Sequence, residues 1–372
     1  MSSFPSIVSY RKEEDYCAFC PKMCRFSCPV SEAEGRETVT PWGKVSIVRF
    51  VREGAIPLDG EAAALFYKCV DCRRCQNFCV HDNDVSAILT AARRQAVAHG
   101  VAPPEITAYL QDSAEGFRVR SPALLERLRA LAPPEAFRSE ADTLFLPGCA
   151  AIKYRPDLIG QTLSLFERLG VEGITLLDGL PQCGGYPLYA AGDATQYTET
   201  AEERNRALAP YATIVSACPA CTGLIGEEMP QHRVVPLVSF LLPHVERYFA
   251  EHPPSRRGAF MYHDSCFLGR GLGCYEEPRK LLALAGIEVV EFPQNRNEAE
   301  CCGAGGLLPL TAPETARKIA RHRLRHAGMG ESQGVVTACA SCSHAFAKVE
   351  EDVPILDLVT LLLAAISPPS PQ

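Results

Sequence analysis

Short apolar runs alternate with amphipathic segments from about residue 142 to the C-terminus. The apolar runs start at Leu144, Ile174, Thr213 and Val234, and then again at Phe260, Ile287, Val335 and Pro354. Between them, segments such as 156–169 and 313–327 carry apolar residues at the spacing of a helix. Because alternating strands and helices build a parallel sheet covered by helices, this region is predicted to have an α/β fold.

The first hundred residues show a different, helical pattern. Thr40 followed by Pro41 is typical of a helix start, and Gly54 is typical of the end of that helix. Two further helices are predicted over 61–68 and 83–100. Cysteine-rich loops connect these segments, so a small helical domain is predicted over residues 1–100. A connector with two Pro-Pro pairs follows over 101–141.

An internal repeat relates the two halves of the α/β region. The offset between equivalent cysteines drifts slowly, from 117 positions (Cys149 to Cys266) through 119 (Cys183 to Cys302) to 121 (Cys218 to Cys339 and Cys221 to Cys342). Such a drift indicates two copies of one domain with small insertions. We expect one copy over 142–250 and the other over 259–372, with 251–257 as the hinge. The overall fold class is then α+β, with a helical N-terminal domain followed by two repeated α/β domains.

Length and charge narrow the class of protein. The chain has 372 residues, a net charge of −7 and a pI of about 5.8, so it has no basic field and nucleic acid is not an expected partner. The apolar run 354–366 is short and contains Asp357, and the N-terminus lacks a signal-peptide core, so no transmembrane segment is predicted. We expect a cytoplasmic protein. Peripheral attachment to the inner membrane through a partner is an open alternative.

The cysteine content is the unusual feature of the composition. The chain has 18 cysteines, and without an export signal they are expected to bind metal rather than to form disulfides. All but Cys274 fall into four groups.

The two N-terminal groups have the spacing of ligands to 4Fe-4S cubanes. One group is Cys69, Cys72, Cys75 and Cys79, and the other, with one extra residue, is Cys17, Cys20, Cys24 and Cys28. In such pairs the fourth cysteine of each group serves the other cluster. The spacing therefore predicts one cubane at Cys17, Cys20, Cys24 and Cys79, and another at Cys69, Cys72, Cys75 and Cys28. Zinc fits less well, because it is saturated by four thiolates, usually supplied as two separated pairs.

The two repeats differ in their number of thiols. The second repeat offers five: Cys266, Cys301, Cys302, Cys339 and Cys342. A cubane needs four terminal ligands, so one thiol is either idle or bridges irons in an opened cluster. In the first repeat Gln182 replaces one member of the adjacent pair, and Cys149, Cys183, Cys218 and Cys221 remain. Those four could hold a cluster, zinc or nothing, since glutamine does not replace a soft bridging thiolate.

These motifs resemble those of a known family. His263-Asp-Ser-Cys266, Glu277-Pro-Arg279 and Glu300-Cys-Cys-Gly303 are similar to segments of the tandem cysteine-rich "CCG" domains in the D subunit of heterodisulfide reductase. The iron–sulfur subunit of glycolate oxidase and the C subunit of anaerobic glycerol-3-phosphate dehydrogenase share them. Those proteins also carry a two-cluster ferredoxin-like domain, so the resemblance covers nearly the whole chain. It implies two 4Fe-4S cubanes and a noncubane 4Fe-4S cluster at the five cysteines of the second repeat.

The same resemblance implies an iron–sulfur electron-transfer subunit of a multi-subunit oxidoreductase. Single electrons would pass between a flavoprotein partner, either a dehydrogenase or an electron-transfer flavoprotein, and a further acceptor such as a quinone, a membrane cytochrome or a disulfide. The chain has no flavin or nicotinamide fingerprint, so it is not expected to oxidise an organic substrate alone. Two alternatives stay open: a catalytic heterodisulfide or disulfide reductase subunit, and a zinc-stabilised scaffold protein. The incomplete first CCG domain holds either a further cluster or zinc, if it holds anything.

Overall fold

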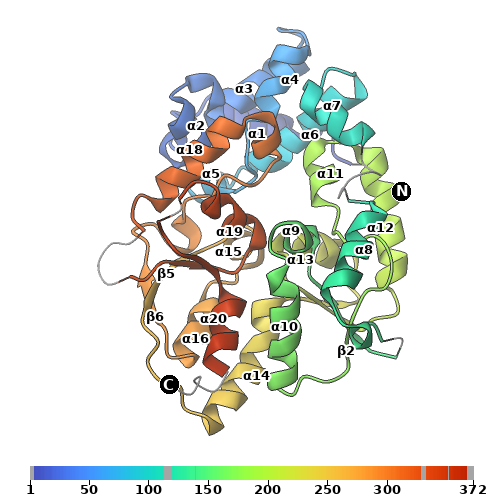
Figure 1. Cartoon of the computed structure of the whole chain (residues 1–372). Coiled ribbons are helices and arrows are strands. Elements are labelled where there is room, and N and C mark those ends of the chain that lie inside the picture. Colours follow the sequence, from blue (N-terminus) through green and yellow to red (C-terminus); the bar gives the residue numbers. More distant parts are fainter. Residues whose placement is uncertain (1–3, 113–118, 139, 328–331, 351, 367–372) are drawn as a thin grey trace. The chain divides into compact units, whose positions relative to one another are not determined.

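The computed structural model describes residues 4–112, 119–138, 140–327, 332–350 and 352–366 (Figure 1). The chain divides into two compact units, each assembled from three segments. The helical unit comprises Met1–Ser113, Gly185–Glu199 and Glu300–Arg323, and the sheet unit comprises Ala114–Gly184, Thr200–Ala299 and Leu324–Gln372. The domain limits expected from the sequence remain a prediction.

Short helices build the helical unit. They are η1 (Ile7–Tyr10), α1 (Arg11–Ala18), η2 (Arg25–Ser27), α2 (Pro29–Glu34), η3 (Glu37–Val39), α3 (Pro41–Arg52), α4 (Gly60–Phe66), α5 (Arg74–Asn77), α6 (Val85–Ala98), α7 (Pro104–Gln111), α11 (Tyr186–Ala191), α17 (Leu308–Thr311) and α18 (Pro313–Leu324). Helix α3 packs against α1 and α6, and α4 packs against α6. Val45, Val48, Phe66 and Ile88 are buried in this unit.

The predicted helix start at Thr40-Pro41 is confirmed. Thr40 Oγ1 accepts a hydrogen bond from the backbone N–H of Gly43 at 3.0 Å, which caps α3 as expected for a threonine at this position. The helix ends at Arg52, close to the predicted stop at Gly54. The helices predicted over 61–68 and 83–100 appear as α4 and α6, each slightly shorter than predicted.

Two parallel four-stranded sheets form the sheet unit. The first has the order β2-β1-β3-β4, and the second has the equivalent order β6-β5-β7-β8. Their strands are β1 (Thr143–Leu146), β2 (Ile174–Leu176), β3 (Thr213–Ser216) and β4 (Arg233–Pro236), then β5 (Ala259–His263), β6 (Glu288–Glu291), β7 (Val335–Thr337) and β8 (Ile355–Asp357). In register, Thr143 pairs with Thr213 and Met261 pairs with Val335. The α/β expectation for both repeats is confirmed.

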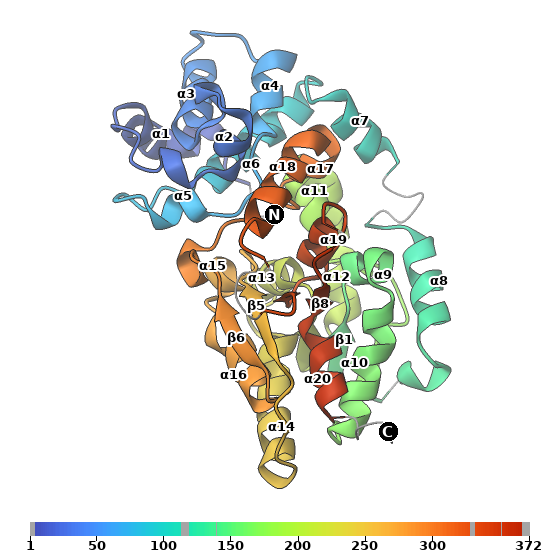
Figure 2. The ribbon, with the colours of Figure 1, turned by 60° about the vertical axis from the view of Figure 1, so that its left-hand side comes forward.

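The remaining helices lie in the sheet unit, except that α12 begins in the helical unit. They are α8 (Pro122–Leu131), η4 (Pro134–Ala136), α9 (Cys149–Tyr154), α10 (Asp157–Arg168), α12 (Ala194–Leu208), α13 (Pro219–Glu228), α14 (Leu237–Glu251), α15 (Gly269–Leu272), α16 (Glu276–Leu284), η5 (Arg296–Glu298), α19 (Ala340–Ala347) and α20 (Leu358–Ile366). Helix α10 lies against α20, and α14 lies against α16 (Figure 2). Helix α10 occupies the same position in the first repeat as α16 in the second, and α14 the same position as α20. The α10–α20 and α14–α16 contacts are therefore equivalent.

The two repeats therefore share one hydrophobic core. Phe145 and Val215 of the first repeat and Tyr262 and Val336 of the second belong to the same buried cluster. No helix in the described residues is long and apolar enough to cross a membrane.

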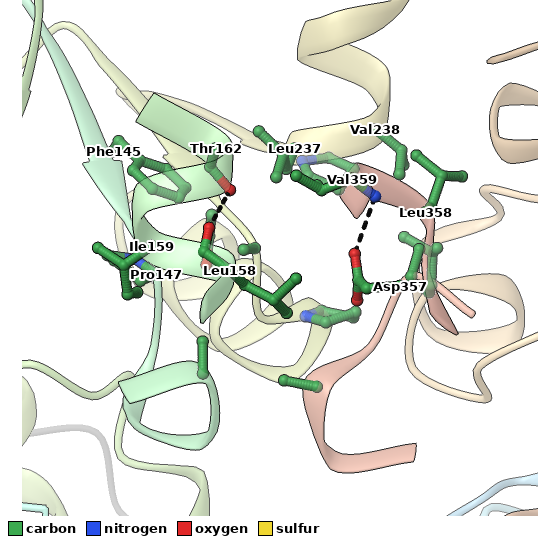
Figure 3. Close-up of a pocket in the computed structure, with 18 residues that line it drawn as sticks. Phe145, Pro147, Leu158, Ile159, Thr162, Leu237, Val238, Asp357, Leu358 and Val359 are labelled. Carbon is green, nitrogen blue, oxygen red and sulfur yellow. Dashed lines mark hydrogen bonds between the residues drawn. The ribbon is translucent and has the colours of Figure 1, made fainter. Parts of the chain in front are cut away.

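A small pocket lies between the repeats, with Asp357 on its wall (Figure 3). Asp357 is 4% exposed, and its Oδ1 accepts a hydrogen bond from the N–H of Val359 at 3.0 Å. Burial raises the pKa of Asp357 to about 6, although the Val359 N–H and the charge of Arg155 oppose the shift. An acidic group in this apolar pocket therefore costs stability when it is ionised.

Asp357→Asn is expected to stabilise the protein more at pH 7.5 than at pH 5. The folded protein keeps a proton on Asp357 up to pH about 6. The unfolded chain releases it near pH 4, so stability falls as the pH rises through this window. Asparagine keeps an acceptor for the N–H of Val359 but does not titrate, so it removes the contribution of this position to the pH dependence of stability. The variant's gain in unfolding free energy should therefore grow by about 1 kcal/mol between the two pH values.

Thermal unfolding at pH 5 and pH 7.5 measures this difference. Asp352→Asn is the matched control, because Asp352 is exposed. A stabilisation by Asp357→Asn that is the same at both pH values would contradict the assigned direction of the pKa shift.

Candidate metal centres

Four of the N-terminal thiols form a first set: Cys17, Cys20, Cys24 and Cys79. Burial, followed by the thiols of Cys17, Cys79 and Cys20, raises the pKa of Cys24 to about 12. Burial also raises the pKa of Cys17 to about 11, and Cys79 and Cys20 contribute to that rise. Thiols that repel one another's charge in this way lie near each other. This is the grouping that the exchange of the fourth cysteine predicts, and its role as a ligand set remains a prediction.

The second set, Cys28, Cys69, Cys72 and Cys75, lines one cavity together with Lys44. Cys28 precedes α2, Cys69 and Cys72 lie in the loop after α4, and Cys75 lies in α5. Asp71 and Arg73 have left-handed backbone conformations, with φ of 52° and 56°, which turn this loop. Burial, and then Cys72, Cys69 and Cys28, raise the pKa of Cys75 well above its usual value. Four thiols around one cavity fit the ligand count of a 4Fe-4S cluster.

The two sets differ in the polar side chain that contacts a sulfur. Asn83 Nδ2 donates to Cys17 Sγ at 3.3 Å in the first set. Lys44 Nζ donates to Cys28 Sγ at 3.7 Å in the second. Burial lowers the pKa of Lys44, but the thiols of Cys28, Cys69, Cys75 and Cys72 raise it, and the net shift is upward. Neither residue lies in a cysteine motif, so the sequence analysis missed both.

A buried arginine holds the loop that carries Cys69. Arg93 is fully buried, and its Nη2 donates to Cys69 O at 2.9 Å. The same guanidinium donates to Phe66 O at 2.9 Å, to Ala190 O at 3.1 Å and to Asp71 Oδ2 at 3.2 Å. Asp71 thus neutralises the charge, and one side chain ties α4, the cysteine loop and α11 together. Only the fold reveals this role, because Ala190 is 97 positions from Arg93.

The glycine loop after Cys302 lies directly against the backbone of Cys69 and Val70. A Cβ at Gly306 would lie 1.8 Å from Cys69 O, and a Cβ at Gly305 would lie 2.1 Å from Val70 O. The N–H of Gly306 donates to the hydroxyl of Tyr186 at 2.9 Å, and that hydroxyl donates to Asp71 Oδ2 at 2.9 Å. No larger residue fits this contact, which explains the two glycines.

Three of the five thiols of the second repeat follow the carboxyl ends of two neighbouring strands. Cys266 follows β5, and Cys339 and Cys342 follow β7, with Cys339 at the start of α19. These three belong to the sheet unit, whereas Cys301 and Cys302 are buried in the helical unit. The convergence of all five sulfurs remains a prediction.

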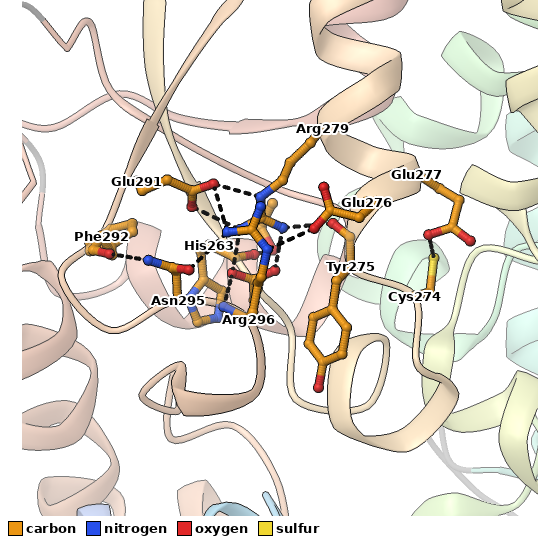
Figure 4. A network of polar contacts seen from close by, with 12 residues as sticks. His263, Cys274, Tyr275, Glu276, Glu277, Arg279, Glu291, Phe292, Asn295 and Arg296 are labelled. Atoms are coloured by element: carbon orange, nitrogen blue, oxygen red, sulfur yellow. Dashed lines mark hydrogen bonds and ion pairs between the residues drawn. The ribbon is translucent and has the colours of Figure 1, made fainter.

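An ion pair anchors the loop that leads to Cys266 (Figure 4). Arg279 Nη1 and Nη2 donate to the two carboxylate oxygens of Asp264 at 2.8 and 2.9 Å, and Arg279 also pairs with Glu291. Asp264 Oδ2 further accepts from the N–H of Arg296 at 2.8 Å. Both Asp264 and Arg279 are buried, so this bidentate pair sets the course of the chain two residues before Cys266.

In the first repeat all four thiols come together in the sheet unit. Cys183 Sγ lies 3.3 Å from Cys149 Sγ. Hydrogen bonds with the thiols of Cys183 and Cys218, and then burial, raise the pKa of Cys221 well above its usual value. The N–H of Gly184 also donates to Cys221 Sγ at 3.3 Å. A single small site with four sulfur donors results.

Gln182 makes its hydrogen bonds through its amide nitrogen, and within the described residues its buried Oε1 has no hydrogen-bond partner. Its Nε2 donates to Leu177 O and to Gly179 O, both at 2.7 Å, and the residue is fully buried. The amide therefore stabilises the loop before Cys183.

Cys274, the cysteine outside the motifs, has a separate environment. Its Sγ contacts Glu277 Oε2 at 3.2 Å and Ser239 Oγ at 3.7 Å. Burial raises its pKa to about 12, with the carboxylate of Glu277 adding to the rise and Ser239 opposing it. It is therefore a protonated thiol with a packing role.

Gly306→Ala is expected to destabilise the protein and to lower its iron content. The new Cβ meets Cys69 O, so the loop of the second set must move. Gly100→Ala is the matched control, because Gly100 has a similar φ of +69° but open space around it. We expect Gly306→Ala to cost about 1–3 kcal/mol more unfolding free energy than the control. Thermal unfolding and iron analysis measure both effects, and equal losses in the two variants would contradict the contact.

Comparison with known protein families matches this arrangement along the chain. The family described as 4Fe-4S dicluster domain matches residues 13–83, and the family described as Cysteine-rich domain (CCG) matches residues 143–226 and 260–347. The first match covers both N-terminal cysteine groups, and the second match occurs twice, once for each repeat. The chain is therefore an iron–sulfur protein with tandem CCG domains.

Several named relatives match this chain over most of their own length. The B subunit of fumarate reductase (CoM/CoB) from Methanothermobacter marburgensis is 25% identical over 96% of this chain and 75% of that protein. The D subunit of dihydromethanophenazine:CoB–CoM heterodisulfide reductase from Methanosarcina acetivorans is 26% identical over 80% of this chain and 77% of that protein. Lactate utilization protein A of Oceanobacillus iheyensis is 24% identical over 50% of this chain and 80% of that protein. The chain therefore belongs to the family of iron–sulfur proteins that join a 4Fe-4S dicluster domain to CCG domains, the family that includes the D subunit of heterodisulfide reductase.

Proposed function

We propose that this chain is the electron-transfer subunit of a multi-subunit oxidoreductase. The two N-terminal sets would each hold a cubane 4Fe-4S cluster, and the five cysteines of the second repeat would hold a noncubane 4Fe-4S cluster. Such clusters supply reversible one-electron chemistry at potentials that the protein tunes. Two of the relatives named above, from Methanothermobacter marburgensis and Methanosarcina acetivorans, are named as subunits of reductases, which supports a role inside a larger assembly.

One observation carries the proposal. Gly305 and Gly306, which follow Cys302 by three and four residues, contact the backbone carbonyls of Val70 and Cys69. The ligand loop of the second set is therefore in van der Waals contact with the loop that follows Cys301 and Cys302. A contact of this kind supports electron exchange between the second cubane and the CCG centre, and Arg93 and Asp71 hold it in place.

An exposed apolar patch supports a protein partner at the first set. Tyr16, Phe19, Met23, Phe26 and Val80 are exposed, with Phe19 at 79% and Val80 at 89%. Each lies within two residues of a cysteine of the first set. Exposed apolar groups that gather around one site mark an interaction surface. A flavoprotein dehydrogenase or electron-transfer flavoprotein that docks on this patch would exchange electrons at the first set, and a quinone-reactive or cytochrome subunit would act further along.

A catalytic disulfide reductase is the second candidate, favoured by the relatives named as heterodisulfide reductase subunits. Gln182 speaks against it, because its amide is engaged by Leu177 O and Gly179 O and supplies no bridging thiolate to the first repeat. Turnover of a disulfide by the isolated chain with an artificial reductant would favour catalysis over relay.

A zinc ion is the best candidate for the first repeat. The Sγ atoms of Cys149 and Cys183 are 3.3 Å apart. Thiolates that share one tetrahedral zinc, at Zn–S distances of about 2.3 Å, lie about 3.8 Å apart. Ligands to separate irons of a cubane lie farther apart than that. The compact thiol set of the first repeat therefore suits one ion better than a cluster.

Removal of a thiol from the second set tests the cluster assignment. Anaerobically purified wild-type protein is expected to be brown and to hold about twelve irons, four in each of three clusters. Cys72→Ser should lose about four irons and one of the two cubane signals in low-temperature paramagnetic resonance. Cys274→Ser, which removes an equally buried thiol outside the sets, should change neither. A colourless protein without iron would reject the proposed function.

Elemental analysis tests the zinc site separately. The wild type is expected to hold about one zinc per chain. Cys218→Ser should lose that zinc while its iron content stays unchanged, because Cys218 belongs to the thiol group of the first repeat. A loss of about four irons instead would identify a cluster there.

A further inference from the structure

Lys44 is a buried cation at the second set of thiols. It is 1% exposed and projects from the first turn of α3. Its Nζ donates to Lys68 O at 2.7 Å and lies 3.7 Å from Cys28 Sγ. Lys44 also lines the cavity around which the four thiols of the second set lie. The ammonium group therefore has a defined position beside the sulfurs, anchored by a backbone carbonyl.

Within the described part of the chain, no carboxylate forms an ion pair with Lys44. The nearby Arg93, which contacts the carbonyl of Cys69, is neutralised by Asp71 at 3.2 Å. An unpaired ammonium is costly to bury, so the charge of Lys44 must be balanced by the thiolates themselves. Thus, unlike Arg93, Lys44 places a positive charge beside the thiols of the second set that no acidic side chain neutralises among the described residues.

Among the described residues, no lysine or arginine side chain donates a hydrogen bond to a sulfur of the first set. Cys17 receives its side-chain hydrogen bond from Asn83, a neutral amide. Burial raises the pKa of Cys17, and the buried acid Glu14, which is itself paired with Arg52, adds to that rise. The two sets therefore have the same donor atoms, but a neutral amide contacts a sulfur of the first set and a cation contacts a sulfur of the second.

We propose that Lys44 holds the reduction potential of the second cluster above that of the first, so that an electron arriving at the N-terminal domain settles on the cluster beside the Gly305–Gly306 loop. This inference rests on the proposed electron-transfer function. Each reduction adds one electron and therefore one negative charge to a thiolate-bound cluster, and no proton is taken up because Lys44 is already an ammonium. A fixed positive charge stabilises the added electron and leaves the oxidised form less favoured. Lys44 would act on the cluster through Cys28, by placing a fixed positive charge 3.7 Å from its Sγ.

A redox titration followed by low-temperature paramagnetic resonance tests the role of Lys44. The protein is purified anaerobically as the full chain and titrated with dithionite and ferricyanide. Lys44→Met should lower the equilibrium constant for reduction of one cluster at least about tenfold, a shift of about 59 mV to more negative potential. The affected signal should be the one that Cys72→Ser removes, and the other signal should move less than about threefold. Because Lys44 is buried, the shift should persist at high salt.

Three variants separate charge from packing. Lys280→Met is the matched lysine control: its side chain is exposed and belongs to the sheet unit, so both potentials should stay at the wild-type values. Lys44→Arg keeps the charge and should stay within about threefold of the wild type. Lys44→Gln can still donate to Lys68 O but is neutral, and it should shift as Lys44→Met does.

The outcomes are distinguishable. A wild-type potential in Lys44→Gln, or a shift in Lys44→Arg as large as that in Lys44→Met, would overturn the role of the Lys44 charge. A wild type without iron would reject the proposed function itself, whereas two intact clusters with potentials unaffected by Lys44→Met would reject only this inference.

Discussion

Repulsion among buried thiolates is the constraint on which the rest of this structure depends. Thiols are brought together in the helical unit and in the first repeat, and both burial and their neighbours disfavour ionisation there. Such groups are stable together only when positive charge or hydrogen-bond donors balance them. In the proposed assignment bound metal would supply most of that balance, and the chain adds Asn83 at the first set and Lys44 at the second. The donors differ, so two otherwise similar cysteine sets acquire different electrostatic surroundings.

The duplicated α/β scaffold carries unequal chemistry. Both sheets have the same strand order, and the α10–α20 and α14–α16 contacts repeat one packing arrangement. A symmetric scaffold would support two equal centres. The adjacent cysteine pair of the second repeat has no counterpart in the first, where the buried Gln182 satisfies its Nε2 with backbone carbonyls. The first repeat retains the shape of a CCG domain with a compact four-thiol site, while the second keeps the full thiol complement.

Contacts among three distant stretches of chain give the helical unit its coherence. Arg93, Asp71 and Tyr186 join the loop after α4 to α11, and Tyr186 also receives the N–H of Gly306. Segments of both repeats, Gly185–Glu199 and Glu300–Arg323, therefore group with the first 113 residues. The ligand loop of the second set is held by the same residues that hold the glycine loop, so the geometry between these two loops is stabilised by buried polar contacts as well as by close backbone packing.

Local pattern was sufficient for much of this protein. The cap at Thr40, the apolar strands, the tandem repeat and the cysteine spacing all depend on residues close in sequence, and the structure and the family comparisons bear out the elements and the family they predict. Lys44, Asn83 and Arg93 carry no such signal, because each acts on a partner 16 to 97 positions away. Amphipathic periodicity and ligand spacing are short-range properties that the chain order itself determines. The balance of charge around buried sulfur is a property of three-dimensional proximity, and only the tertiary structure decides it.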